Sequence, residues 1–495
     1  MGKLQSLVKD TAIYGLSSII GRFLNYLLVP LYTAKMSVES GNYGIVTNVY
    51  AWTAILLVLL TFGFETTFFR FASKENADIK RVFSMSMQVI GALCTVFLLL
   101  VFMFLPAISE NLGYAQNPEF IGMMAVVVSL DALQAIPFGL LRFQKKPLKF
   151  ASLKLLFIGM NILLNLFAFV LLPKLAASHP DTFGSLYDPH NQAFYVFLIN
   201  LVCTSLITLF FIPELKMFRF TADRLLLKNM LSYSWPLLLL GVAGILNLNA
   251  DKIIYTWLVP GQQGIEELGI YGASVKIAAI MAMLMQAFRY AYEPFVFGNS
   301  KEKDSKELYA KAMKYFIVMA MTAFLVVVFY MDIIRYIISP DYWEGLKVVP
   351  IVMAAEIFMG IYFNLSFWYK LNDETYWGAI FSFIGCAVLF AMNILLVPKY
   401  GYIACAWASF AGYFTAMTLS YFIGQKRNAI DYDMKSIFIY TLLFAVIYGV
   451  SLAIPIENSI VKMAINTILL ALFVAYFIKK DLPLKSIPVI GKFFR

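Results

Sequence analysis

Apolar stretches of about 20 residues recur from one end of the chain to the other, each long enough to cross the roughly 30 Å hydrocarbon core of a bilayer as a helix. The hydrophobic share of the 495 residues is 61%, whereas soluble domains have roughly 45–50%. A soluble core could not cover this much apolar surface. The sequence therefore predicts an all-α membrane protein with about 14 transmembrane helices.

The positions of these helices follow from the apolar windows. They are predicted at residues 11–33, 43–64, 82–105, 119–141, 151–172, 193–213, 232–258, 269–291, 309–331, 348–369, 376–397, 402–424, 437–454 and 459–478. The first stretch is too long for a cleaved signal peptide and carries Arg22, so we expect it to remain as the first helix.

Basic residues between the spans predict the orientation. With a cytoplasmic N-terminus, 29 Lys and Arg residues fall in cytoplasmic segments and 6 in outer segments. An excess of Lys and Arg is typical of the cytoplasmic loops of membrane proteins. Both termini are therefore predicted to face the cytoplasm. The net charge of +10 reflects this topology rather than binding of nucleic acid.

The chain also repeats itself. Tyr43-Gly44 recurs as Tyr271-Gly272, and Asp131 recurs as Glu356, at offsets of 228 and 225 residues. Because each repeat has an even number of helices, the sequence predicts two parallel six-helix lobes. The predicted domains are an N-terminal lobe (1–218), a C-terminal lobe (219–426), two additional transmembrane helices (427–480) and a basic cytoplasmic tail (481–495).

Four basic residues remain inside predicted spans, where an unpaired charge costs at least about 2.5–3.5 kcal/mol. Arg22 lies about halfway along the first helix, so it is expected to face a cavity rather than form a structural ion pair. Lys276 either lines a cavity or snorkels to the outer interface. Arg289 stands four residues before Glu293 and could pair with it. Lys252 adjoins an acidic residue and is either an interfacial anchor or a cavity wall.

Acidic residues in the spans are candidates for coupling to an ion gradient. Asp131 and Glu356 are repeat-related, and each could pair with a cation or bind a coupling ion. Asn247 and Asp251 share one face of a helix, because they are four residues apart, and their oxygens could bind sodium.

Enzyme and metal motifs are absent from the sequence. There is no phosphate-binding glycine loop or metal-ligand cluster, and the four cysteines all lie in apolar spans. His179 and His190 lie in one outer loop, which could serve a membrane glycosyltransferase but is better explained as a solvated connector. We therefore expect no enzymatic activity, no cofactor and no metal.

Several segments resemble the polysaccharide-unit (O-antigen and capsule type) flippases of the multidrug, oligosaccharidyl-lipid and polysaccharide exporter superfamily. They are Gly21-Arg22-Phe23, Leu28-Val29-Pro30-Leu31-Tyr32, Asn42-Tyr43-Gly44 and Gly63–Phe71. The resemblance implies two lobes around a cationic cavity that alternately opens to either side. It implies that undecaprenyl-pyrophosphate-linked oligosaccharides cross the bacterial inner membrane, with Arg22 and Lys276 holding the diphosphate.

Other functions remain as alternatives. Peptidoglycan-precursor (lipid II) flippases share the 14-helix plan, but the second helix here has no basic residue before Arg70. Drug antiporters of the same superfamily usually have twelve helices, and a membrane glycosyltransferase or polymerase needs a larger catalytic loop. The expected protein is a monomer coupled to a proton or sodium gradient, with a polysaccharide polymerase or glycosyltransferases as further partners. Arg22→Ala is expected to abolish transport without affecting insertion.

Overall fold

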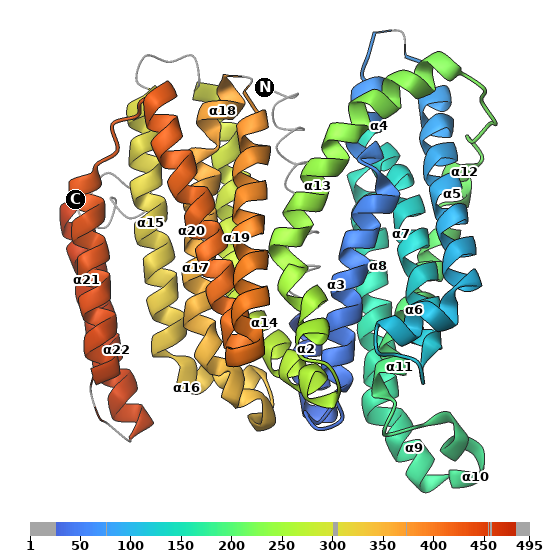
Figure 1. Ribbon diagram of the computed structural model, residues 1–495, viewed down its shortest axis with the longest axis horizontal. Helices are drawn as coiled ribbons and strands as arrows, with labels where there is room; N and C mark the ends of the chain where they lie inside the picture. Colours follow the sequence, from blue (N-terminus) through green and yellow to red (C-terminus); the bar gives the residue numbers. More distant parts are fainter. Residues whose placement is uncertain are drawn as a thin grey trace. The chain divides into compact units, whose positions relative to one another are not determined.

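The computed structural model describes residues 26–75, 77–299, 305–372, 374–453, 455 and 458–481. In this part of the chain all regular structure is helical (Figure 1), and 13 helices are long and apolar enough to cross a membrane. Residues 11–25 of the first predicted helix, including Arg22, lie outside the described residues, and α2 (Leu28–Lys35) follows them. The all-helical membrane fold predicted from the sequence is confirmed.

The chain forms two compact units, and the first contains the described part of Met1–Ala273 together with Phe390–Ala404. Its helices are α3 (Asn42–Thr61), α4 (Phe64–Ala72), α5 (Ile79–Met103), α6 (Leu105–Asn111), α7 (Pro118–Phe143), α8 (Pro147–Leu166), α9 (Leu172–Ser178), α10 (Pro180–Phe183), α11 (Gln192–Leu209), α12 (Ile212–Leu215), α13 (Arg224–Leu258) and the start of α14 (Gln262–Asn299). A π-helical stretch, Phe167–Leu171, joins α8 to α9. The centre of this unit is α7, which packs against α3, α5 and α11.

A backbone break separates α3 from α4 within what the sequence predicts as the end of one span. Phe62 and Gly63 both adopt the left-handed conformation, with φ of 50° and 71°. A Cβ on Gly63 would lie 2.9 Å from the Cβ of Leu237 on α13, so glycine also permits the close packing here. The break redirects the chain so that Glu65, in the first turn of α4, can reach α7.

Two helices, α13 and α14, extend well beyond the ends predicted for them at 232–258 and 269–291. The apolar window predicts a span from residue 232, but α13 begins at Arg224, where the Asp223 carboxylate caps the helix by accepting a hydrogen bond from the Leu226 amide at 3.0 Å. The first turns of α13 contain Arg224 and Lys228, which lower local hydropathy without interrupting the helix. Hydropathy therefore locates the membrane-crossing part of a helix rather than the whole helix.

The first turns of α3 and α14 cross at unusually short range. A Cβ added to Gly44 would lie 1.9 Å from the carbonyl oxygen of Ile265, and one added to Gly272 would lie 2.5 Å from Thr47 Oγ1. Glycine is required where two helix backbones approach this closely. Gly44 and Gly272 are the glycines of the two repeat-related Tyr-Gly pairs, and each lies at this crossing against the other helix.

The second unit comprises Ser274–Leu389 and the described part of Cys405–Arg495. After the remainder of α14 it contains α15 (Ser305–Phe329), α16 (Met331–Ile334), the 3₁₀ segments Arg335–Ile337 and Pro340–Val348, α17 (Val349–Leu365), α18 (Phe367–Leu371), α19 (Tyr376–Tyr400), α20 (Tyr402–Arg427), α21 (Met434–Ala453) and α22 (Ser459–Lys480). The end of α19 and the start of α20, within Phe390–Ala404, belong to the first unit. The long α15 followed by the short α16 repeats the order of α5 and α6. The lobe boundaries at residues 218 and 426 stay predictions.

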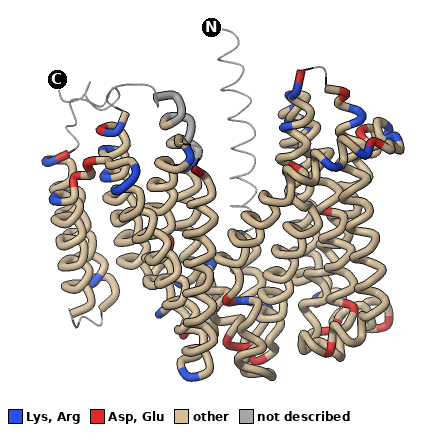
Figure 2. The backbone as a smooth tube through the Cα atoms, turned by 45° about the horizontal axis from the view of Figure 1, so that its top comes forward, with Lys and Arg blue, Asp and Glu red and all other residues tan. Residues whose placement is uncertain are grey.

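The two additional helices pack on α15 and are held by a charged cluster at one end. The Lys314 ammonium on α15 bonds to Asp481, just after α22, at 2.5 Å and to Asp433, just before α21, at 3.2 Å. Tyr440 on α21 donates a hydrogen bond to Asp481. We call these four residues the Lys314 cluster. Figure 2 shows that most charges lie, like these, near helix ends.

Candidate functional site

A cavity of about 530 Å³ lies inside the first unit, and we call it the polar cavity. Helices α3, α4, α7, α8 and α11 form its wall. Its polar lining residues are Thr61, Glu65, Asp131, Gln134, Arg142 and Lys154. Charged side chains are rare within membrane spans because of their insertion cost, so a cavity with four of them is the strongest candidate site in the described residues.

One face of α7 supplies most of the polar cavity. Asp131, Gln134, Phe138 and Arg142 follow one another at intervals of three or four residues, which places them on the same side of an α-helix. More of α7 is buried than of any other described span, 72% of its apolar window. The buried helix therefore carries a polar stripe from the membrane interior toward the end predicted to be cytoplasmic.

At that end of the stripe, Arg142 forms an ion pair with Glu65. The Arg142 guanidinium also lies over the ring of Phe69, with its central carbon 5.0 Å from the ring centroid. The two charged side chains keep 35% and 47% of their surface exposed, so this pair lies at the mouth of the cavity rather than deep inside it.

Asp131 and Lys154 on α8 both line the cavity and interact electrostatically, but they form no ion pair. The Lys154 ammonium lies 4.1 Å from the ring centroid of Phe138. Among the described residues, none donates a hydrogen bond to the Asp131 carboxylate. Both groups therefore have bonding capacity left for a ligand or an ion.

Gln134 joins the α7 side of the cavity wall to α11 by two hydrogen bonds. Its amide nitrogen donates to the Thr204 carbonyl at 3.0 Å and to Thr208 Oγ1 at 2.8 Å, both on α11. The cavity thus combines two carboxylates, two cations and a fixed amide, a set that can accept an anionic group on its cations or a proton on its carboxylates.

Of the four basic residues predicted for substrate binding, the three that the structure describes do not line the polar cavity. Arg22 is outside the described residues, Lys276 is exposed on α14, and the Arg289 guanidinium lies 4.5 Å from the ring centroid of Phe363. The side chain of Glu293, the expected partner of Arg289, is not among those described. Lys252 forms an ion pair with Asp251 at 3.0 Å. Their assignment to the substrate stays a prediction.

Of the predicted coupling residues, only Asp131 lines the polar cavity. Glu356 is half-buried on α17 in the second unit. Both carboxylate oxygens of buried Asp251 already accept hydrogen bonds, from Tyr271 at 2.5 Å and from Lys252. Asn247 donates to the Ala243 carbonyl at 2.9 Å. The described residues contain no group of three or more His, Cys, Asp or Glu that could hold a metal.

Arg142 and Lys154 are the site residues that sequence reasoning missed. Both fall in the segment counted as a cytoplasmic loop, but α7 continues to Phe143 and α8 begins at Pro147, which places Lys154 about 10 Å into a helix. The available signal was the spacing of Asp131, Gln134 and Arg142, which repeats with the period of a helix.

Comparisons with known proteins agree with this fold. Residues 7–297 match the family described as polysaccharide biosynthesis protein. An uncharacterized membrane protein of Methanocaldococcus jannaschii is 23% identical over 96% of this chain and 93% of its own length.

Solved structures of two kinds of transporter share the fold. The lipid II flippase MurJ in an inward closed conformation matches with a TM-score of 0.71 and 14% identity, covering 94% of this chain and 98% of that one. An inward-facing multidrug resistance transporter of the MATE family matches with a TM-score of 0.63 and 13% identity, covering 82% and 94%. The family match covers more than half of the sequence, and the chain therefore belongs to the polysaccharide biosynthesis protein family, with the fold of the flippases and transporters of the MOP superfamily.

Proposed function

We propose that this protein is a flippase that moves undecaprenyl-pyrophosphate-linked oligosaccharides across the bacterial inner membrane by alternating access. Membership of the polysaccharide biosynthesis protein family supports a role in handling lipid-linked sugars. The fold supports a carrier rather than an enzyme, because its relatives of known structure are a flippase and a drug transporter.

The polar cavity is the observation that carries this proposal. A diphosphate cannot cross hydrocarbon without compensation of its charge, and Lys154 and Arg142 offer two cations within helices of the first unit. A charge-assisted hydrogen bond to such a group contributes about 1.5–3 kcal/mol. The diphosphate would enter from the Arg142 end, while the polyprenyl tail stays in the lipid.

The carboxylates of the same cavity suggest how transport could be driven. Asp131 has no hydrogen-bond donor among the described residues and lies near Lys154, so protonation of Asp131 would remove a negative charge that repels a phosphate group bound to Lys154. Coupling to a proton gradient through Asp131 is therefore our favoured form of the proposal. Glu356 and Asp251 remain alternatives, with sodium as the alternative ion.

The test is translocation of a fluorescent lipid-linked diphospho-oligosaccharide in proteoliposomes. Lys154→Met should lower the rate about tenfold or more, because it removes a charge-assisted contact of about 1.5–3 kcal/mol. Lys146→Met is the matched control, since Lys146 is exposed, lies eight residues away and does not line the cavity. Equal rates for both variants would contradict the role of the cavity.

Translocation of lipid II is the second candidate, favoured by the likeness in fold to the lipid II flippase over 94% of this chain. Both substrates present a diphosphate, so the cavity alone does not discriminate between them. The same proteoliposomes with the two lipids in competition give the answer. Preference for the lipid-linked oligosaccharide supports the proposal, and preference for lipid II replaces it.

A further inference from the structure

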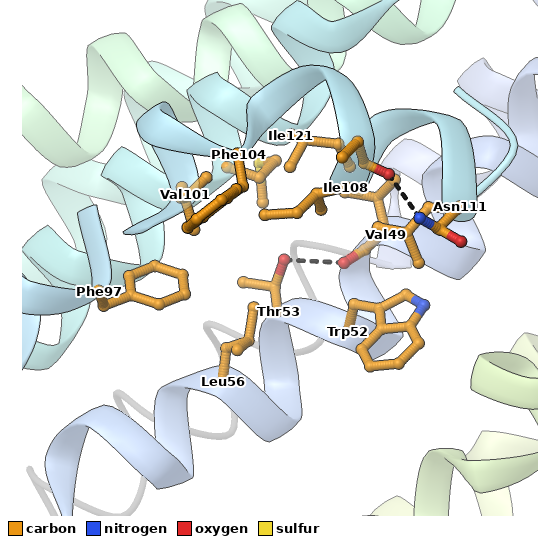
Figure 3. A pocket seen from close by; sticks show the side chains of 14 residues that line it. Val49, Trp52, Thr53, Leu56, Phe97, Val101, Phe104, Ile108, Asn111 and Ile121 are labelled. Carbon is orange, nitrogen blue, oxygen red and sulfur yellow. Dashed lines mark hydrogen bonds between the residues drawn. The ribbon is translucent and has the colours of Figure 1, made fainter. Parts of the chain in front are cut away.

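The first unit contains a second cavity of about 550 Å³, which we call the apolar cavity (Figure 3). Its wall comes from α3, α5, α6 and α7 and shares no residue with the polar cavity. Phe97, Phe104, Ile121 and Leu56 are among the side chains that project into it. The proposed transport function gives this space no role.

Two polar side chains in its wall bond to their own helices, and the buried indole nitrogen of Trp52 has no hydrogen-bond partner among the described residues. Thr53 Oγ1 donates to the Val49 carbonyl and Asn111 Nδ2 donates to the Ala107 carbonyl, both at 2.8 Å. Dashed lines mark these two hydrogen bonds in Figure 3. A water molecule in a cavity needs two to four polar partners, and apolar cavities of this kind stay dry but accept hydrocarbon. The wall therefore selects an apolar occupant.

The cavity runs along the helices from the end of α6 toward the middle of α3. Tyr114, just after α6, donates to Asn48 Oδ1 at 2.9 Å, which places the end of α6 beside the start of α3. Asn111 and Trp52 thus mark the α6 end of the cavity, and Phe97 and Leu56 mark the opposite end, as seen in Figure 3. The stretch from Val49 to Leu56 spans about 10 Å.

We propose that the apolar cavity binds one acyl chain of a phospholipid from the leaflet at the α6 end. The cavity extends over most of the roughly 15 Å depth of one hydrocarbon leaflet. A cavity of about 150 Å³ holds a benzene ring, so this volume corresponds to roughly 20 carbon atoms, the size of one acyl chain.

Mass action also favours a phospholipid. Bulk lipids are present around the protein at far higher concentration than any transported lipid, and occupancy follows concentration. The bound chain fills the gap between α3 and the α5–α6 segment, which contact each other much less than either contacts α7. It thereby supports the packing of the first unit.

The experiment uses the full chain in liposomes containing phosphatidylcholine with a photoreactive diazirine in mid-chain, followed by peptide mapping. Cross-links should concentrate on residues 49–56 and 97–112. Thr53→Trp, which fills the cavity, should abolish them. Thr95→Trp is the matched control, because Thr95 makes the same bond to its own helix, at 2.7 Å to Gly91, but lies on the exposed face of α5.

Three results would overturn the assignment. Labelling spread evenly over all lipid-facing helices would show that the cavity holds no chain, and so would undiminished labelling in the Thr53→Trp protein. Displacement of the label by a small molar fraction of polyprenyl phosphate would identify an isoprenoid tail as the occupant. An unchanged elution volume in gel filtration verifies that Thr53→Trp folds, and none of these results depends on the transport assay.

Discussion

Gly44 shows how one residue can control the distance between two helices. A Cβ at this position would lie 1.9 Å from the Ile265 carbonyl oxygen, which belongs to the backbone and cannot rotate away. We expect Gly44→Ala to force α3 and α14 apart and to destabilise the protein by about 1–3 kcal/mol, as overpacking does. The melting temperature in detergent should fall accordingly.

Gly91→Ala is the control, because it is not expected to lower the melting temperature. Gly91 lies inside α5, and a Cβ there would meet nothing within 4 Å. Alanine is the better helix former by about 0.5–1 kcal/mol, so this variant should melt at the same or a higher temperature. Equal destabilisation by both substitutions would show that the short crossing at Gly44 is not the cause.

The Arg142–Glu65 pair permits a charge-reversal test at the mouth of the polar cavity. Glu65→Arg or Arg142→Glu alone places like charges together, whereas the double variant restores a pair of opposite charges. Because both side chains are partly exposed, the interaction should amount to about 1 kcal/mol, or roughly fivefold in transport rate. The measurement is translocation by the three variants, and failure of the double variant to recover activity would mean that one residue acts on the substrate directly.

Single residues also show how far the sequence could predict the site. Asp131 could be found because a carboxylate in an apolar window is conspicuous. Lys154 falls inside the predicted helix 151–172, but it lies so near the start of that helix that it counts with the basic loop before it. Asp251 was visible, but the donors that occupy its carboxylate come from neighbouring residues in space and in sequence, which a linear pattern does not reveal.

Among the elements, α21 and α22 are attached to α15 by the ion pairs of the Lys314 cluster. Lys314 and Asp481 retain only 11% and 12% side-chain exposure. Removal of one partner from a mostly buried pair costs about 3 kcal/mol. Lys314→Met should therefore raise the rate of hydrogen exchange in α21 and α22, while exchange in α7 stays unchanged. Equal exchange in α21 and α22 of the variant and the parent protein would contradict the role of the cluster.

The same cluster predicts a dependence on pH. Hydrogen bonds from the Ser436 hydroxyl and amide, followed by Lys314, lower the pKa of the Asp433 carboxyl to about 2. A carboxyl with a lowered pKa stabilises the fold above about pH 4 and loses this contribution as the pH falls toward 2. Exchange in α21 should therefore increase over that range. Asp433→Asn should flatten this dependence, and a dependence unchanged by the substitution would exclude Asp433 as its source.

Most elements could be predicted because apolar length and helix length coincide. For α5, α7, α15 and α22 the predicted ends fall within four residues of the observed ones. The errors occur where a helix continues into water, as α13 does at Arg224, or where a break such as Gly63 interrupts an apolar window. Hydropathy indicates which part of a helix lies in the membrane, whereas capping residues and residues in the left-handed conformation determine where the helix begins and ends.

The two-lobe repeat stays a prediction from the sequence, and the glycines of its two Tyr-Gly pairs, Gly44 and Gly272, both lie where α3 crosses α14. The arrangement of cavities could not be predicted, since each one requires side chains from four or five helices that are distant in sequence. Sequence periodicity identifies which face of a helix is polar. Only packing determines which faces share a cavity.

Orientation in the membrane is the remaining property of the whole molecule that the basic residues predict, with 29 on one side and 6 on the other. Single cysteines at Lys146 and His179, both exposed, should react with a membrane-impermeant maleimide from opposite sides of the membrane. In intact cells His179→Cys should be labelled, and Lys146→Cys only after permeabilisation. The parent protein is the control, because its four cysteines are all buried and should stay unlabelled. The reverse pattern would place the Arg142 end of the polar cavity on the outer side, and a diphosphate made in the cytoplasm could not then enter by the route proposed here.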